Sequence, residues 1–149
     1  MRKNPAEWSA YNNLGSLLLE RGRPAEAVSV LERALALRPD VPEVHHTMAD
    51  AWLRLGRRDE ARAEYARALT VAPGYAPAHN SLGLLLLDEG KATEAIAEFE
   101  QATRLRPDLA APFYNLGNAL VALDRWREAE PYYERALQID PEFAQAHNN

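Results

Sequence analysis

A pattern of small and bulky residues returns four times along the chain at a constant spacing. It is clearest in four dipeptides: Leu14-Gly15, Met48-Ala49, Leu82-Gly83 and Leu116-Gly117. Each dipeptide begins 34 residues after the one before it. Behind each dipeptide an alanine, a large residue, a second alanine and a proline follow at fixed distances, as Ala95, Phe99, Ala102 and Pro107 do in the third copy. A period of this length predicts stacked units that bury their apolar faces against their neighbours, not one central core.

Each copy contains two helical stretches separated by a turn. Apolar residues recur at helical spacing, as Tyr11, Leu14 and Leu18 do. The turn residues are Gly22, Gly56, Gly90 and Asp124, and aspartate tolerates the left-handed turn better than most residues. A proline ends each second stretch because it cannot donate the helical hydrogen bond. The expected helices cover about 6–20, 24–37, 42–55, 58–71, 76–89, 92–105, 110–123 and 126–139.

Two local features modify this expectation. Asp40 and Glu43 have the spacing of a capping box at the start of the third helix. Pro131 stands inside the expected last helix, where the other copies have Ser29, Ala63 and Ala97. Proline inside a helix removes one hydrogen bond and clashes with the preceding turn, so we expect a kink or a late helix start there.

The alternation of residue size has a packing explanation. Gly15, Ala49, Gly83 and Gly117 are small, and so are Ala27, Ala61, Ala95 and Ala129 on the facing helices. Small residues on both helices let the two backbones of a unit approach closely, whereas Leu31, Tyr65, Phe99 and Tyr133 fill the space between units. A larger side chain at Ala61 or Ala95 should therefore overpack the unit.

Composition excludes several classes of function. The chain has 149 residues, a net charge of −5 and no cysteine, which argues against a general nucleic-acid footprint and excludes disulfides, thiol catalysis and zinc–thiolate sites. No apolar run approaches the roughly 20 residues of a membrane span. The first residues, Met1 to Pro5, lack the apolar segment of a signal peptide, which favours a cytoplasmic location. The predominance of arginine and alanine indicates a bacterial source.

The full chain resembles the tetratricopeptide repeat family. The family's preferred residue types stand in all four copies: Gly15, Ala49, Gly83 and Gly117; Ala27, Ala61, Ala95 and Ala129; Ala34, Ala68, Ala102 and Ala136; Pro39, Pro73, Pro107 and Pro141. The resemblance implies an all-α fold, a right-handed superhelical solenoid of antiparallel helix pairs. It also implies that the first helices line a concave groove, which in this family generally binds a segment of another protein.

The repeats predicted in this frame are residues 8–41, 42–75, 76–109 and 110–143. Residues 1–7 match the tail of a preceding repeat or an N-terminal cap, because Pro5 is in register with Pro39. Residues 144–149 match the start of a truncated fifth repeat. The last second helix should consequently expose an apolar side, and we expect self-association through this C-terminal end.

The resemblance also assigns side chains to the groove. The candidate ligand-binding residues are Asn12, Asn13, His46, Thr47, Asp50, Asn80, Ser81, Tyr114, Asn115 and Asn118. Asn13, Asn115 and Asn149 share one repeat position, with Thr47 and Ser81 between them, and a side-chain amide can both donate to and accept from a peptide backbone. This incomplete asparagine ladder resembles the repeats of protein O-linked N-acetylglucosamine transferases. Plain solvent exposure explains the asparagines equally well.

Other features of the groove restrict the partner. The positions at which chaperone-binding members hold a carboxylate with Lys and Arg contain no cation here. The expected groove charges are Glu20, Glu43, Asp50 and Asp88 against Arg54, so we expect a neutral or mildly basic protein segment. Tyr114 faces the groove and is a candidate hot spot.

No catalytic, cofactor or metal site is expected. His45 and His46 are adjacent and point about 100° apart on a helix. His45, His79 and His147 share a repeat position with Tyr11 and Phe113, which indicates packing. We find no Ser/His/Asp spacing, phosphate loop or carboxylate pair of the kind that catalysis requires.

The sequence therefore predicts a non-enzymatic protein–protein interaction scaffold that binds a partner segment in its groove, without nucleic acid or membrane insertion. Two alternatives remain: a substrate-recruiting arm of a larger enzyme such as a glycosyltransferase, and a fragment or design characterised for its fold alone.

Overall fold

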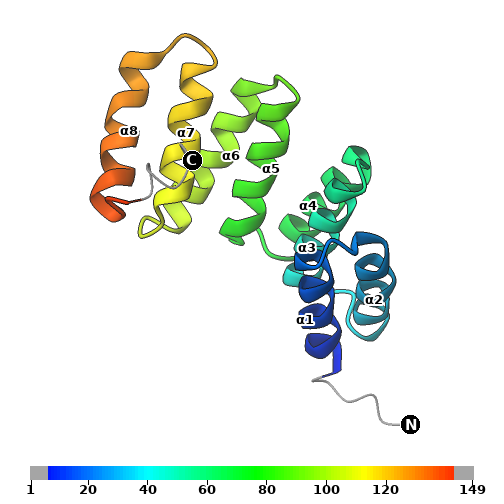
Figure 1. Ribbon diagram of the computed structural model, residues 1–149. Helices are drawn as coiled ribbons and strands as arrows, with labels where there is room; N and C mark the ends of the chain where they lie inside the picture. The colour runs from blue at the N-terminus through cyan, green and yellow to red at the C-terminus, as the bar shows by residue number, and fades with distance from the viewer. Residues whose placement is uncertain (1–6, 143–149) are drawn as a thin grey trace. The chain divides into compact units, whose positions relative to one another are not determined.

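The computed structural model describes residues 7–142, and its secondary structure in that range is helical (Figure 1). The helices are α1 (Glu7–Glu20), α2 (Pro24–Leu37), α3 (Pro42–Arg54), α4 (Arg58–Val71), α5 (Ala76–Asp88), α6 (Ala92–Leu105), α7 (Ala110–Val121) and α8 (Trp126–Ile139). The predicted tail before Glu7 and the predicted start of a fifth repeat lie outside the described residues. The all-α class expected from the sequence is confirmed.

Contacts divide the chain into two units. Unit 1 extends to Pro73 and contains α1 to α4, and unit 2 begins at Gly74 and contains α5 to α8. In unit 1, α1 packs on α2 and α3 packs on α4, while α3 also contacts both α1 and α2. Unit 2 repeats this arrangement, with α7 in contact with α5, α6 and α8 (Figure 1). Each unit is thus two helix hairpins whose first helices, α1 and α3 or α5 and α7, lie in contact.

The turns inside the hairpins adopt the left-handed conformation that the sequence predicts. The φ angles are +68° at Gly22, +74° at Gly56 and +76° at Gly90, and Asp124 takes the same region with φ of +57°. Because of this shared turn, each second helix begins and ends where we expected it. Among the first helices, α1 ends where expected, α3 and α5 end one residue earlier, and α7 ends two residues earlier.

Two expectations about helix ends are wrong. The capping box at Asp40 does not form, because α3 begins at Pro42 and its cap residue is Val41, which makes no side-chain cap hydrogen bond. Asp40 instead lies 3.3 Å from the Arg38 guanidinium. The late start of the last helix is also wrong, because α8 begins at Trp126 and continues unbroken through Pro131 to Ile139. Pro131 stands only one turn inside the helix, where it costs one hydrogen bond to a helix held by packing along its length.

Close approach inside the hairpins depends on the absence of a side chain at glycine. A Cβ atom added at Gly15 would lie 2.7 Å from the Leu31 side chain. At Gly83 it would lie 2.6 Å from the Phe99 ring, and at Gly117 it would lie 2.7 Å from the Tyr133 ring. Real Cβ atoms essentially never come that close to a neighbour. Each of these large side chains therefore packs directly on the backbone of the first helix.

The alanines that face these contacts leave no room for growth. Ala95 is fully buried on α6, whereas Ala97 on the same helix is exposed. We expect Ala95→Leu to lower the free energy of unfolding by about 1–3 kcal/mol through overpacking. Urea unfolding measures this change. Ala97→Leu is the matched control and should unfold like the parent chain, and equal stability of the two variants would contradict the packing argument.

Candidate functional site

The predicted groove residues all lie on the first helices of their hairpins. Those of unit 1 lie on α1 and α3, which contact each other, and those of unit 2 lie on α5 and α7, which also contact each other. Asn13 is exposed, and Thr47 and Asn115 are buried. The half-buried residues are Asn12, His46, Asp50, Asn80, Ser81, Tyr114 and Asn118. Each unit thus brings its own set of candidates together on one pair of helices.

One pair of predicted residues in unit 2 is joined by a hydrogen bond. The Asn115 amide nitrogen on α7 donates to the Asn80 side-chain oxygen on α5 at 3.0 Å. This hydrogen bond links the two first helices, and the Asn115 side chain that makes it is only 6% exposed. The one ladder asparagine of unit 2 in the described residues is therefore buried and bonded to Asn80, which stands at the neighbouring repeat position. Ligand contact by Asn115 stays a prediction.

The corresponding positions in unit 1 behave differently. Asn12 aligns with Asn80 and Thr47 aligns with Asn115, but Thr47 donates its hydroxyl to the backbone oxygen of Glu43 at 2.9 Å. The side-chain oxygen of Asn12 is buried and has no hydrogen-bond partner. A hydroxyl at this position therefore does not reproduce the cross-helix bond of unit 2.

Asp50 and Asn118 are engaged from the second helix of their own hairpin. The Tyr65 hydroxyl donates to the Asp50 carboxylate at 2.5 Å, and the Tyr133 hydroxyl donates to the Asn118 side-chain oxygen at 2.8 Å. Both pairs are 15 residues apart. The sequence carried this signal, because only the two repeats with tyrosine at the later position have Asp or Asn at the earlier one. We did not use it in the prediction.

Aromatic rings extend these two contacts. The His46 ring centroid lies 5.6 Å from that of Tyr65, and the Tyr114 centroid lies 5.6 Å from that of Tyr133. Tyr133 thereby holds both Asn118 and Tyr114 of α7. Burial raises the pKa of the Tyr133 hydroxyl, so it remains a donor at neutral pH.

The two units present different chemistry on their first helices. In unit 2, Leu84 on α5 is 44% exposed and Val121 on α7 is 45% exposed. The residue of α3 that corresponds to Leu84 is Asp50. Arg54 is the cation that the sequence places in the groove of unit 1. Its guanidinium already donates a hydrogen bond to the backbone oxygen of Leu19 at 2.8 Å. Unit 1 is thus polar at the position of Leu84, whereas at the position of Val121 it has Leu19 and Leu53. Unit 2 combines its two exposed apolar side chains with amides and a tyrosine.

The shared histidine position holds buried polar pairs. Nδ1 of His45 lies 2.7 Å from the Glu64 carboxylate on α4, and its Nε2 lies 2.9 Å from the backbone oxygen of Pro39. Both ring nitrogens face acceptors, so the geometry favours a ring that carries both protons. Nδ1 of His79 makes the same contact with Glu98 at 2.6 Å. The sequence predicted packing here and missed the glutamate partners, which recur 19 residues after each histidine.

No metal-binding arrangement accompanies these histidines. Within residues 7–142, no group of three or more His, Asp or Glu side chains is placed to hold a metal ion. The Glu64 carboxylate also accepts from Arg67, so His45 belongs to a buried ionic network. The hydrogen bond that His45 donates to the Glu64 carboxylate is the main cause that raises the pKa of His45 above its ordinary value of 6.5.

A raised histidine pKa makes stability depend on pH in one direction. The folded state holds the proton more tightly than the unfolded chain, so the contribution is complete below about pH 6.5 and disappears as pH rises through the folded-state pKa. We expect the chain to lose stability over that range relative to the double variant His45→Phe/Glu64→Tyr, which carries the side-chain types of Phe113 and Tyr132. If the folded-state pKa of His45 is higher by one than that of the unfolded chain, the resulting contribution to the free energy of unfolding is about 1.4 kcal/mol.

Urea unfolding at a series of pH values from about 6 to about 9 measures this difference. The double variant is the matched control, because the fourth repeat already accommodates its side chains at the equivalent positions. Parallel stability profiles for the two proteins would contradict a protonated His45 in the folded state.

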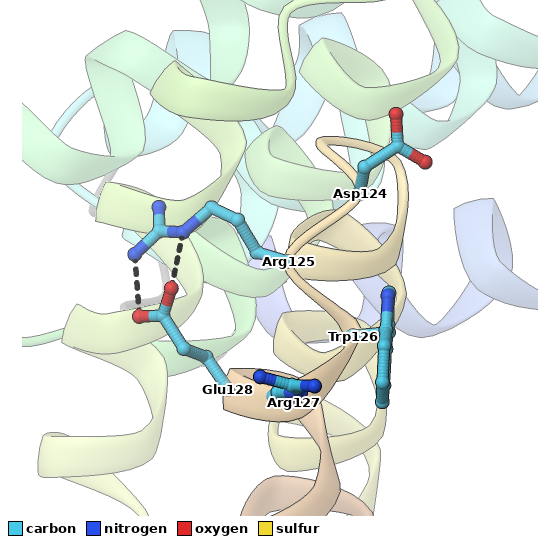
Figure 2. Close-up of a pocket in the computed structure, with 5 residues that line it drawn as sticks. All are labelled: Asp124, Arg125, Trp126, Arg127 and Glu128. Atoms are coloured by element: carbon cyan, nitrogen blue, oxygen red, sulfur yellow. Dashed lines mark hydrogen bonds and ion pairs between the residues drawn. The ribbon is translucent and has the colours of Figure 1, made fainter.

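Another part of the surface contains an exposed tryptophan. Asp124, Arg125, Trp126, Arg127 and Glu128 line a pocket of about 330 Å³ where α7 turns into α8 (Figure 2). The Arg125 guanidinium holds both carboxylate oxygens of Glu128, at 2.9 and 2.8 Å (Figure 2). The Arg127 guanidinium carbon lies 5.1 Å from the centroid of the Trp126 ring, which is 61% exposed. The predicted groove residues do not line this pocket.

Stacked helix hairpins of constant length and register define a helical-repeat protein. Two family profiles, each described as "Tetratricopeptide repeat", match residues 18–85 and 74–142. The chain therefore belongs to the tetratricopeptide repeat family, whose repeats are generally non-enzymatic and serve as protein–protein interaction scaffolds. No described helix is both long enough and apolar enough to cross a bilayer.

Solved structures of the same fold include two bacterial proteins. PilF of Pseudomonas aeruginosa is 26% identical, with a TM-score of 0.86 over 91% of this chain and 62% of that chain. MamA of Desulfovibrio magneticus RS-1 is 25% identical, with a TM-score of 0.78 over 91% of this chain and 76% of its own. Another MamA crystal structure is 22% identical, with a TM-score of 0.81 over 95% of this chain and 83% of that one. None of the curated protein sequences matches the chain.

Proposed function

We propose that the chain is an interaction scaffold that binds a segment of a partner protein along the first helices of unit 2. Asn80, Leu84 and Leu87 stand four and three residues apart on α5, and Tyr114, Asn118 and Val121 have the same spacing on α7. Residues with this spacing share one face of a helix. The observation that carries the proposal is the exposure of Leu84 and Val121, at 44% and 45%, beside these polar side chains.

The chemistry of this face favours a particular kind of segment. Burial of Leu84 and Val121 by apolar side chains of a partner would supply affinity at about 25 cal/mol for each Å² removed from water. Asn80 and Asn118 each accept one hydrogen bond, from Asn115 and Tyr133. The NH₂ group and the second lone pair of each side-chain amide can still bond a peptide backbone. Tyr114 is held against Tyr133, so little side-chain entropy remains for a ligand to remove. The partner segment is therefore mainly apolar, with neutral or mildly basic flanks.

The first helices of unit 1 form a separate surface with candidate residues of its own. Asn13 is exposed on α1. Asn12 on the same helix is half-buried, as are His46 and Asp50 on α3. Hydrogen bonds to exposed polar groups contribute little net affinity but constrain the register of a bound chain. We therefore expect any binding of a segment to unit 1 to be weaker than binding to unit 2.

The proposal can be tested with a displayed library of random short peptides. Peptides selected on the intact chain should be mainly apolar, and Tyr114→Ala and Leu84→Ala should each weaken their binding at least about tenfold. Leu137→Ala is the matched control, because Leu137 has the same 44% exposure as Leu84 but lies on α8, a second helix. Fluorescence anisotropy of labelled peptides measures the affinities. Equal losses for all variants, or none for the two first-helix variants, would contradict the proposal.

Self-association through the C-terminal end also stays a prediction. The observation that favours it is the surface of α8, on which Trp126 is 61% exposed and Leu137 is 44% exposed. The fold does not require tryptophan at this position, because Pro24, Arg58 and Ala92 occupy it in the other repeats.

A further inference from the structure

Unit 2 contains a second pocket, which lies away from the predicted groove residues. It has a volume of about 300 Å³ and is formed where α6, α7 and α8 meet. Its lining residues are Ile96, Glu100, Leu116, Leu120, Arg125, Glu128, Pro131 and Tyr132. We call it the Leu120 pocket.

The Leu120 pocket has an apolar base and a charged opening. Leu116 and Leu120 are 1% and 3% exposed, so they form its base. The side chains of Glu100, Arg125 and Glu128 are 46%, 45% and 59% exposed, so they lie at its opening. The pocket can therefore hold an apolar group below a polar one.

Unit 1 shows what fills this space when the sequence differs. The residue of α3 that corresponds to Leu120 is Trp52, and Arg57 and Glu60 correspond to Arg125 and Glu128. The Arg57 guanidinium carbon lies 4.3 Å from the centroid of the Trp52 ring, and Arg57 also pairs with Glu60. In unit 1 an indole is thus packed beneath the paired arginine.

Unit 2 keeps the paired arginine but lacks the indole. Arg125 holds Glu128 as Arg57 holds Glu60, whereas leucine at position 120 supplies a smaller side chain and no ring. The face of the Arg125 guanidinium is therefore available to a ring from another molecule. Arginine stacks favourably on aromatic rings, and most favourably on tryptophan.

Charge at the opening indicates what should accompany such a ring. Glu100 and Glu128 each carry a negative charge, and Arg104 and Arg125, with which they pair, each carry a positive charge, so these four groups sum to zero. Arg125 is held by both carboxylate oxygens of Glu128. The Glu100 carboxylate attracts Arg125 electrostatically, and its ion pair with Arg104, at 3.7 Å between exposed side chains, leaves it accessible to a further cation. A cation next to the ring would complement Glu100.

We propose that the Leu120 pocket binds an aromatic side chain that is flanked by lysine or arginine on a partner protein. The ring occupies the place that the Trp52 indole takes in unit 1 and stacks on Arg125. The flanking cation pairs with Glu100. This site is separate from the first-helix surface and does not depend on it.

Tryptamine is a suitable probe, because it joins an indole to a single positive charge. We expect saturable chemical-shift changes at the amides of Leu116, Leu120 and Tyr132 when tryptamine is titrated into the ¹⁵N-labelled chain. Indole-3-propionate carries the same ring with a negative charge and should bind about fivefold more weakly. Glu100→Gln should remove this preference while leaving the base of the pocket intact.

Two substitutions at one register position provide the matched controls. Leu120→Trp places an indole in the pocket, as Trp52 does in unit 1, and should abolish the shifts. Trp52→Leu should create a second tryptamine site, with new shifts around Arg57. Shifts that do not saturate, that map to α5 or that persist in Leu120→Trp would overturn the proposal. If Leu120→Trp does not fold, equal binding of the two probes to the parent chain, or an unchanged preference in Glu100→Gln, overturns it.

Discussion

The structure depends on the contact between a small residue on each first helix and a large residue on the second. Gly83 touches the Phe99 ring and Gly117 touches the Tyr133 ring so closely that a Cβ atom would lie 2.6–2.7 Å from ring carbons. This contact brings the two helices of a hairpin close together. Because it recurs every 34 residues, the first helices α5 and α7 are brought into contact and present one face to solvent.

Equivalent positions of different repeats hold side chains of different polarity, while the helices keep the same register. Two equivalent positions hold the His45–Glu64 pair in the second repeat and Phe113 and Tyr132 in the fourth. A buried ionic pair is weak evidence for net stability, because desolvation offsets the attraction between the charges. Exchange between polar and apolar pairs is therefore thermodynamically cheap. The same freedom accounts for Asp50 in unit 1 at the position where unit 2 exposes Leu84. It also accounts for the pocket of unit 2 where Leu120 stands at the position of Trp52.

Most of the fold could be predicted from the sequence, and less of the candidate site. Periodic apolar residues and left-handed turns at Gly22 and Asp124 define helix ends locally, so the second helices were placed correctly. Asp40 failed as a cap because a shift of one residue in the helix start removes a capping box. Pro131 failed as a helix start because packing along α8 outweighs one lost hydrogen bond. The error at Pro131 shows where tertiary packing overrides a local preference.

The site residues were harder to predict because their exposure depends on side chains from other helices. Nothing local in the sequence shows that Asn115 is buried and bonded to Asn80, since the bond joins residues 35 positions apart. The pairs Tyr65–Asp50 and Tyr133–Asn118 were predictable in principle, because both members change together between repeats. Pocket volume is the least predictable property, since it depends on how eight side chains, from three helices and the turn before α8, fill one space.

The most direct test of this account is nuclear Overhauser spectroscopy between the glycine α-protons and the large side chains that face them. We predict strong cross-peaks from Gly83 to the Phe99 ring and from Gly117 to the Tyr133 ring, together with cross-peaks from Gly15 to the Leu31 methyl groups. Absence of these cross-peaks in a spectrum that shows the ordinary contacts within each helix would contradict the packing on which the fold and both proposed binding surfaces depend.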